Sequence, residues 1–201
     1  MFYSRRPLTA LAFAFLFTLA AQAQNSSEPP ASSTDLKTTT PVAQWRVYAS
    51  DGRSMQNWHG QAQLQSINFE RSKQYRWNGE LGMIFSTHVI NEPRSWFGDG
   101  SQNVPAAGLS LMVRHRFKND THAAQPFIEL SSGPMWSTER VPAATSHFNF
   151  LSQLGVGYVF HPDRRMAWVL GWRFGHISNA GYGRLNSGLN INSLMIGTQL
   201  R

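Results

Sequence analysis

The chain has 201 residues, of which 18 are Lys or Arg and 11 are Asp or Glu, so its formal net charge is +7. Charged residues make up only 14%, which argues against a disordered chain, and the lack of a second long apolar run argues against a bundle of membrane helices. A soluble globular domain or a transmembrane β-barrel remains. The absence of cysteine excludes disulfides, zinc thiolate sites, iron–sulfur clusters and a cysteine nucleophile.

Residues 1–23 have the pattern of a secretory signal peptide. Arg5 and Arg6 form its basic start, an apolar stretch follows, and Ala21, Gln22 and Ala23 form a cleavage site. The apolar stretch has about 13 residues, whereas a spanning helix needs about 20. Residues 24–43 are rich in Ser, Thr and Pro and are predicted to be a polar linker. A secreted chain rarely meets nucleic acid, so the positive charge is better explained by anionic lipid or a solvated surface.

The rest of the chain, residues 44–201, is predicted to form strands. Apolar residues alternate with small or polar residues in segments of about ten, and turn-rich stretches separate the segments. The predicted strands cover residues 44–50, 58–70, 76–90, 105–118, 123–137, 147–161, 166–179 and 190–201.

The alternation indicates which environment each face of a strand meets. In residues 105–118, Leu109 and Leu111 lie on one face, while Ser110 and Arg114 lie on the other. A soluble sandwich could show the same alternation. However, the polar faces are rich in Gly, Ser and Gln with few charges, which suits a tight polar interior better than a solvated surface. The apolar faces are therefore expected to meet lipid.

Strands can cross hydrocarbon only when every backbone polar group is paired within the protein, which requires a closed barrel. We therefore predict an all-β fold, an eight-stranded antiparallel transmembrane β-barrel with a filled lumen. Glu80, Arg114, Glu129 and Arg173 take the inward parity and are predicted to form a buried ion network with a scaffold role. A secretion signal followed by such a barrel indicates the bacterial outer membrane.

A pair of polar residues interrupts the lipid-facing series at the end of the seventh predicted strand. The series through Trp172 and Phe174 reaches His176 and Ser178, which point to the same side. An imidazole beside a hydroxyl is the arrangement that a serine esterase requires, because the base takes the proton of the nucleophile. The strand runs outward from a periplasmic N-terminus, so the pair is expected at the outer leaflet, where lipopolysaccharide carries ester-linked acyl chains.

Further polar residues near this pair suggest supporting roles. Asn190 shares the lipid-facing parity of the eighth strand and could hold the imidazole of His176 in one tautomer, although it would stabilise an imidazolium less than Asp or Glu would. Asn179 and the backbone N–H of Gly181 are candidate oxyanion donors, and Asn186 could donate similarly or brace the loop.

The segment FGHISNAGYGRLNSGLN, residues 174–190, resembles the signature of the lipid A deacylase (PagL) family of outer-membrane barrels. PFIEL at 126–130 with Gly133 and Pro134, HFNF at 147–150 and LGVG at 154–157 are weaker matches. The resemblance implies hydrolysis of the 3-position ester of lipid A, release of a 3-hydroxy fatty acid, and no metal or other cofactor. It assigns the nucleophile to Ser178, the base to His176 and the oxyanion role to Asn179 and Gly181. The acidic member of the family's triad falls at Asn190, where this sequence departs from the family pattern.

Two other functions remain open from the sequence. A non-enzymatic small barrel, such as an adhesin, would explain the architecture but not the outward polar cluster. An acyltransferase would use Ser178 to pass an acyl group to another lipid. The sequence also leaves a homo-oligomer open. The remaining histidines have no ligand spacing, and most are expected to be interfacial or solvated; they are His59, His88, His115, His122, His147 and His161.

Overall fold

The computed structural model describes residues 43–55, 62–75, 78–92, 94–95, 98–117 and 123–200. The predicted signal peptide, and the linker apart from Ala43, lie outside these residues. The strands are β1 (Ala43–Ser54), β2 (Gln63–Gln74), β3 (Gly79–Asn91), β4 (Arg94–Ser95), β5 (Gly98–Asp99), β6 (Val104–Arg116), β7 (Ala124–Ser137), β8 (Phe148–Phe160), β9 (Met166–Ser178) and β10 (Leu189–Leu200). No helix in the described ranges is long and apolar enough to cross a membrane.

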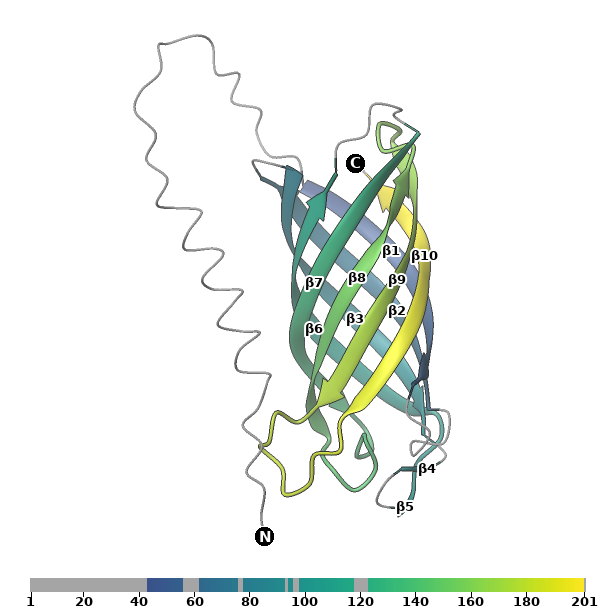
Figure 1. Ribbon diagram of the computed structural model, residues 1–201, viewed down its shortest axis with the longest axis vertical. Helices are drawn as coiled ribbons and strands as arrows, with labels where there is room; N and C mark the ends of the chain where they lie inside the picture. Colours follow the sequence, from purple (N-terminus) through teal and green to yellow (C-terminus); the bar gives the residue numbers. More distant parts are fainter. Residues whose placement is uncertain are drawn as a thin grey trace, which may run out of the picture. The chain divides into compact units, whose positions relative to one another are not determined.

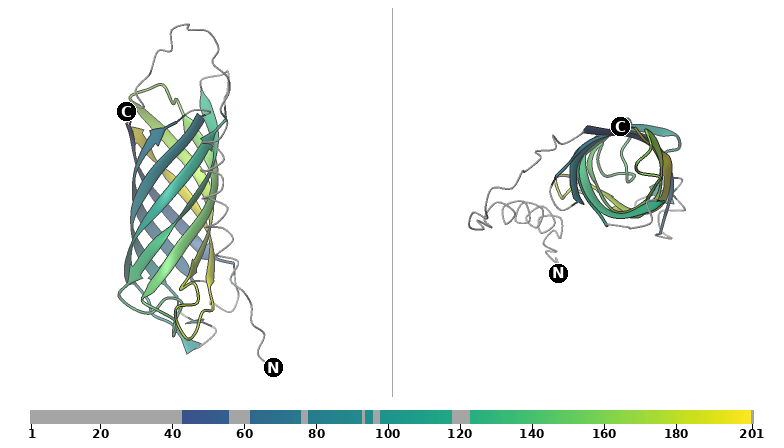
Figure 2. Two further views of the ribbon diagram at one scale, coloured as in Figure 1. Left: turned by 90° about the vertical axis from the view of Figure 1, so that its left-hand side faces the viewer. Right: turned by 90° about the horizontal axis from the view of Figure 1, so that it is seen from above.

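Eight of these strands form a closed barrel in the order β1, β10, β9, β8, β7, β6, β3, β2 (Figure 1). Every neighbouring pair is antiparallel, and β1 closes the barrel by pairing with β10 from Trp45 to Ser54. Figure 2 shows the tilted strands wrapped around the lumen. β4 and β5 form a short separate hairpin. The prediction of an eight-stranded antiparallel barrel is therefore confirmed.

The first two strands differ in extent from the prediction. β1 continues to Ser54 rather than ending at residue 50, and β2 (Gln63–Gln74) continues beyond residue 70. Residues 58–61 of the predicted second strand lie outside the described residues. Asp51 and Gly52 have the composition of a turn. In the barrel, however, Asp51 pairs with Leu194 on one side and Gln65 on the other, so ladders on both sides keep the strand extended.

The faces of the strands follow the predicted alternation. Exposed and buried residues alternate along β3, β6 and β9, and large apolar residues form the exposed set. In β6, Leu109, Leu111 and Val113 are exposed, whereas Ser110 and Arg114 are buried. The described strands leave no free edge in the barrel wall, and their outer face is apolar. Both properties suit the hydrocarbon of a membrane.

An ion network fills part of the lumen. Arg114 donates to Glu70 at 2.8 Å, to Glu80 at 3.0 Å and to Glu129 at 2.5 Å. Arg173 donates to Glu129 at 2.5 Å and to the Tyr48 hydroxyl at 2.8 Å. The predicted network of Glu80, Arg114, Glu129 and Arg173 is therefore present.

The network also has members that the sequence analysis did not include. Arg46 pairs with Glu70 and Glu80, and Arg116 Nε lies 2.6 Å from Glu80 Oε1. The amide oxygens of Gln44 and Gln199 accept further hydrogen bonds from Arg46. Neutral oxygens thus supplement the carboxylates in satisfying the arginines, as burial of charge requires.

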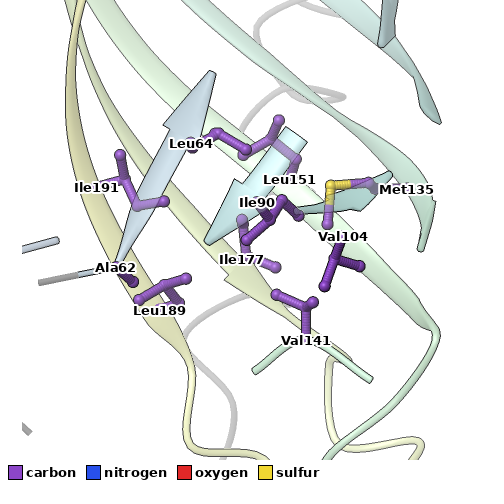
Figure 3. Close-up of a cluster of buried hydrophobic side chains, with 10 residues drawn as sticks. All are labelled: Ala62, Leu64, Ile90, Val104, Met135, Val141, Leu151, Ile177, Leu189 and Ile191. Carbon is purple, nitrogen blue, oxygen red and sulfur yellow. The ribbon is translucent and has the colours of Figure 1, made fainter. Parts of the chain in front are cut away.

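Apolar side chains close the lumen at the end that carries residues 179–188, which we call the external end. Figure 3 shows this cluster, which consists of Ala62, Leu64, Ile90, Val104, Met135, Val141, Leu151, Ile177, Leu189 and Ile191. Ile177 and Leu189 are fully buried, and they adjoin the outward-facing His176 and Asn190 in the chain. The cluster therefore packs against the inner side of the last residues of β9 and the first residues of β10.

Arg114→Leu should lower the free energy of unfolding by about 3–5 kcal/mol, because it leaves three buried carboxylates short of a partner. Urea unfolding of the refolded barrel in detergent micelles, followed by tryptophan fluorescence, measures the change. Arg164→Leu, in the exposed turn between β8 and β9, is the control and should change stability by no more than about 0.5 kcal/mol. Equal stability of the two variants would contradict a structural role for the network.

Candidate active site

The lipid-facing series of β9 ends in polar side chains. Trp168, Leu170 and Trp172 are exposed, His176 is half-buried, and Ser178 is only 3% exposed. β9 remains in register with β8 to its last residue, where Ser178 lies opposite Phe150. The pleat is therefore unbroken, and Ser178 keeps the outward parity of the tryptophans.

The imidazole of His176 is held by Asn190 of the neighbouring strand. The two residues face each other in the register of β9 and β10, and His176 Nδ1 lies 2.6 Å from Asn190 Oδ1. An amide oxygen can only accept, so Nδ1 carries the hydrogen and donates it. In the neutral ring this leaves Nε2 as the proton acceptor.

Gly188 packs against the other side of the same ring. A Cβ at this position would lie 2.8 Å from His176 Cε1 and 3.4 Å from Nε2. Its φ of +64° is also in the left-handed region that favours glycine. The end of the loop before β10 therefore helps to set the ring position, a role that the sequence analysis did not assign.

Ser178 and His176 lie on one face, but their side chains are not hydrogen-bonded. Positions two residues apart along a strand are about 6.6 Å apart, which a serine and a histidine side chain can bridge. Among the described residues, no hydrogen bond joins Ser178 Oγ to the imidazole. The structure thus joins His176 to Asn190 by a hydrogen bond, and it places Ser178 on the same face without a hydrogen bond to His176.

The three candidate oxyanion residues form a hydrogen-bonded loop. The N–H of Gly181 donates to Asn179 Oδ1 at 3.0 Å, and Asn179 Nδ2 donates to the carbonyl of Leu185 at 2.8 Å. The N–H of Asn179 donates to Asn186 Oδ1 at 3.3 Å. These bonds order the loop that follows Ser178, and they occupy the N–H of Gly181 and one amide donor of Asn179.

Two serines extend the polar site across the barrel wall. Ser152 lies opposite His176, and Ser132 lies opposite Ser152. The sequence analysis missed both, although each interrupts a lipid-facing series, Ser132 after Leu130 and Ser152 between Phe150 and Leu154. A polar residue at a lipid-facing position was therefore the available signal.

A second serine–histidine pair lies inside the barrel. Ser66 Oγ is 2.6 Å from His88 Nδ1, and both residues are buried. His88, which is 4% exposed, is an exception to the expectation that most of the scattered histidines are interfacial or solvated. The parity of its strand turns the side chain into the lumen, so this pair has no access to lipid.

The barrel and its outward polar residues define a class: a small outer-membrane protein with a polar site that faces the lipid. In the part of the chain that the structure describes, no three His, Asp or Glu side chains are grouped as metal ligands would be. The site offers instead an imidazole, hydroxyls and amides, which are groups used in acyl transfer.

Comparison with known proteins identifies the family. The model of the family described as lipid A 3-O-deacylase (PagL) matches residues 37–199. The chain therefore belongs to the lipid A 3-O-deacylase (PagL) family. It is an outer-membrane enzyme that hydrolyses the acyl ester at the 3 position of lipid A. No curated protein sequence matches the chain.

Solved structures show the same fold at low sequence identity. The outer-membrane enzyme PagL is 19% identical with a TM-score of 0.56, and the match covers 78% of this chain and 99% of that chain. Neisserial surface protein A (NspA) is 9% identical with a TM-score of 0.56, covering 79% and 94%. Outer Membrane Protein W of E. coli is 10% identical with a TM-score of 0.50, covering 80% and 97%.

Gly188→Ala should reduce deacylation at least about tenfold, because the new methyl group meets the His176 ring and the backbone resists this φ. The fatty acid released from lipopolysaccharide, measured by mass spectrometry, reports the rate. Gly98→Ala is the matched control, since Gly98 also has a positive φ, +126°, but has open space around it. Wild-type activity in a folded Gly188→Ala barrel would show that the ring position does not matter.

Proposed function

We propose that Ser178 is the nucleophile of the deacylase, that His176 is its general base, and that Asn190 orients the base. The observation that carries the proposal is the hydrogen bond from His176 Nδ1 to Asn190 Oδ1 on the lipid-facing side of the barrel. It leaves Nε2 free to accept a proton and places this acceptor on the same face as the Ser178 hydroxyl.

In the proposed reaction, the Ser178 hydroxyl turns towards Nε2 when the ester binds. Catalytic hydrogen bonds are often unformed in a free enzyme and tighten only around the substrate. Oγ attacks the ester carbonyl while Nε2 takes its proton, and a tetrahedral oxyanion forms. The oxyanion collapses, the alcohol oxygen of lipid A leaves with the proton from His176, and the acyl group stays on Ser178.

Water completes the proposed cycle. His176 Nε2 removes a proton from a water molecule as the water oxygen attacks the acyl group on Ser178. The second tetrahedral intermediate then releases the fatty acid, and the proton returns to Ser178 Oγ. The position of the site at the external end of β9, near the polar boundary of the outer leaflet, supports this step because water is available there.

Asn179 and Gly181 are proposed to stabilise the two oxyanions. This role requires the bond from the Gly181 N–H to Asn179 Oδ1 to open when the ester binds, so that the N–H can point to the developing charge. Asn186 would then keep the loop in place through its bond to the N–H of Asn179.

Ser178→Ala should abolish release of fatty acid from lipopolysaccharide while the barrel still folds, because the nucleophile is removed but strand pairing is not. Mass spectrometry of the lipid A, with heat-dependent gel mobility as the test of folding, measures both properties. Ser66→Ala is the control, since the inner pair of Ser66 and His88 is sealed in the lumen and activity should be retained. Retained activity in Ser178→Ala together with lost activity in Ser66→Ala would place the reaction in the lumen and contradict the proposal.

Asn190→Asp should keep or raise the rate of deacylation. A carboxylate at this position still accepts the hydrogen of His176 Nδ1 and stabilises the imidazolium that forms during attack. Asn190→Leu, of similar size without an acceptor, should lower the rate by about 100-fold or more. Steady-state rates of the two folded variants provide the comparison, and a large loss in Asn190→Asp would contradict the orienting role.

A further inference from the structure

We propose that the hydroxyls of Ser132 and Ser152 bind a hydroxyl group carried by the acyl chain close to its ester, and so make the enzyme selective for hydroxylated chains. The inference rests on the proposed function of Ser178 and His176, because it places the ester carbonyl at Ser178. It adds a specificity site deeper in the membrane.

The two serines belong to a row of outward polar residues that crosses four strands. In register, Asn190 of β10 faces His176 of β9, His176 faces Ser152 of β8, and Ser152 faces Ser132 of β7. All four are half-buried, and each has the parity of the lipid-facing residues of its strand. The row therefore lies on the outer surface of the barrel.

The row goes deeper into the membrane from β10 to β7. His176 is two residues from the external end of β9, whereas Ser152 is four residues from Phe148, the external end of β8, and Ser132 is five residues from Ser137, the external end of β7. The tilt of these strands is visible in Figure 1. Ser152 and Ser132 therefore lie deeper than Ser178, where an acyl chain that extends from an ester at Ser178 towards the membrane centre can reach them.

The surroundings of the serine pair are apolar. Leu130 and Leu154, the next outward residues towards the membrane centre, are exposed, as is Leu111, which faces Ser132 from β6. Ser132 Oγ and Ser152 Oγ are 2.8 Å apart. These three outward neighbours of the serine pair are thus leucines, and the pair is polar among them.

The serine pair has one hydroxyl hydrogen that it does not use in the bond between the two serines. Two hydroxyls have two hydrogens, and the bond between them uses one. Among the described residues, that bond is the only side-chain hydrogen bond that either serine makes. In hydrocarbon the remaining donor has no water to bond with, and an unpaired hydroxyl is unfavourable there. A hydroxyl on the substrate would satisfy it.

The distance also suits a hydroxyl near the ester. Ser152 and Ser178 are diagonal neighbours on adjacent strands, because Ser178 faces Phe150 two residues away from Ser152. Side chains in this relation have Cβ atoms about 7–8 Å apart. A hydroxyl two carbons from the carbonyl, with one hydrogen bond to Ser152, fits within that span.

The test is a competition between two lipid A esters that differ only in whether the 3-position acyl chain carries a hydroxyl two carbons from the carbonyl. The refolded full chain acts on their mixture in detergent micelles, and mass spectrometry of the released acids gives the ratio of kcat/KM values. Wild type should prefer the hydroxylated chain by about tenfold or more. The double variant Ser132→Ala and Ser152→Ala should bring the ratio close to one, because kcat/KM falls on the hydroxylated ester more than on the plain ester.

Thr87→Val is the matched control, because it removes an outward hydroxyl from β3, which is not adjacent to β7, β8 or β9, and should leave the ratio unchanged. An unchanged preference in the double serine variant would overturn the inference, as would a wild-type ratio near one. Equal loss on both esters would also overturn it, by making the serines part of the chemistry. Activity of Ser178→Ala on either ester would instead contradict the proposed nucleophile, so the two failures are distinguishable.

Discussion

The pairing of backbone N–H and C=O groups in a medium without water is the constraint on which this structure depends. Hydrocarbon offers these groups no partners, so the eight long strands must close on themselves, and β1 meets β10 to remove the last edge. Closure sorts the side chains into two sets by parity. One set meets lipid, and the other fills a lumen with arginine–glutamate pairs and, at the external end, a plug of apolar side chains.

The same lack of water in the membrane requires the outward polar side chains to find partners. A polar side chain on the outer wall is costly unless it is paired, and His176 bonds to Asn190 while Ser132 bonds to Ser152. The substrate of this family is itself a membrane lipid. A site on the outer wall can receive its ester directly from the leaflet, without extracting a long acyl chain into water. An outward position therefore suits hydrolysis of a membrane lipid.

Parity also separates two serine–histidine pairs that the chain contains. Ser66 and His88 are already hydrogen-bonded, as a nucleophile and its base would be, yet they face a closed lumen. His176 and Ser178 lack that bond but lie on the lipid side, with Asn190 and Gly188 holding the ring. The direction of the side chains therefore distinguishes the two pairs, because Ser178, at 3% exposed, is as buried as Ser66, at 7%. A hydroxyl can rotate into place, whereas a barrel strand cannot turn over.

The sequence by itself determined the number of long strands, the face of each side chain and the outward position of His176, Ser178 and Asn190, because a period of two residues is a local property of a strand. Only the tertiary structure decided the full extent of β1 and β2, the lumen partners Arg46 and Glu70, the burial of His88, and the alignment of Ser132 and Ser152 with His176. These depend on the register between strands that are far apart in the chain. Register is set when the barrel closes, and no single segment contains that information.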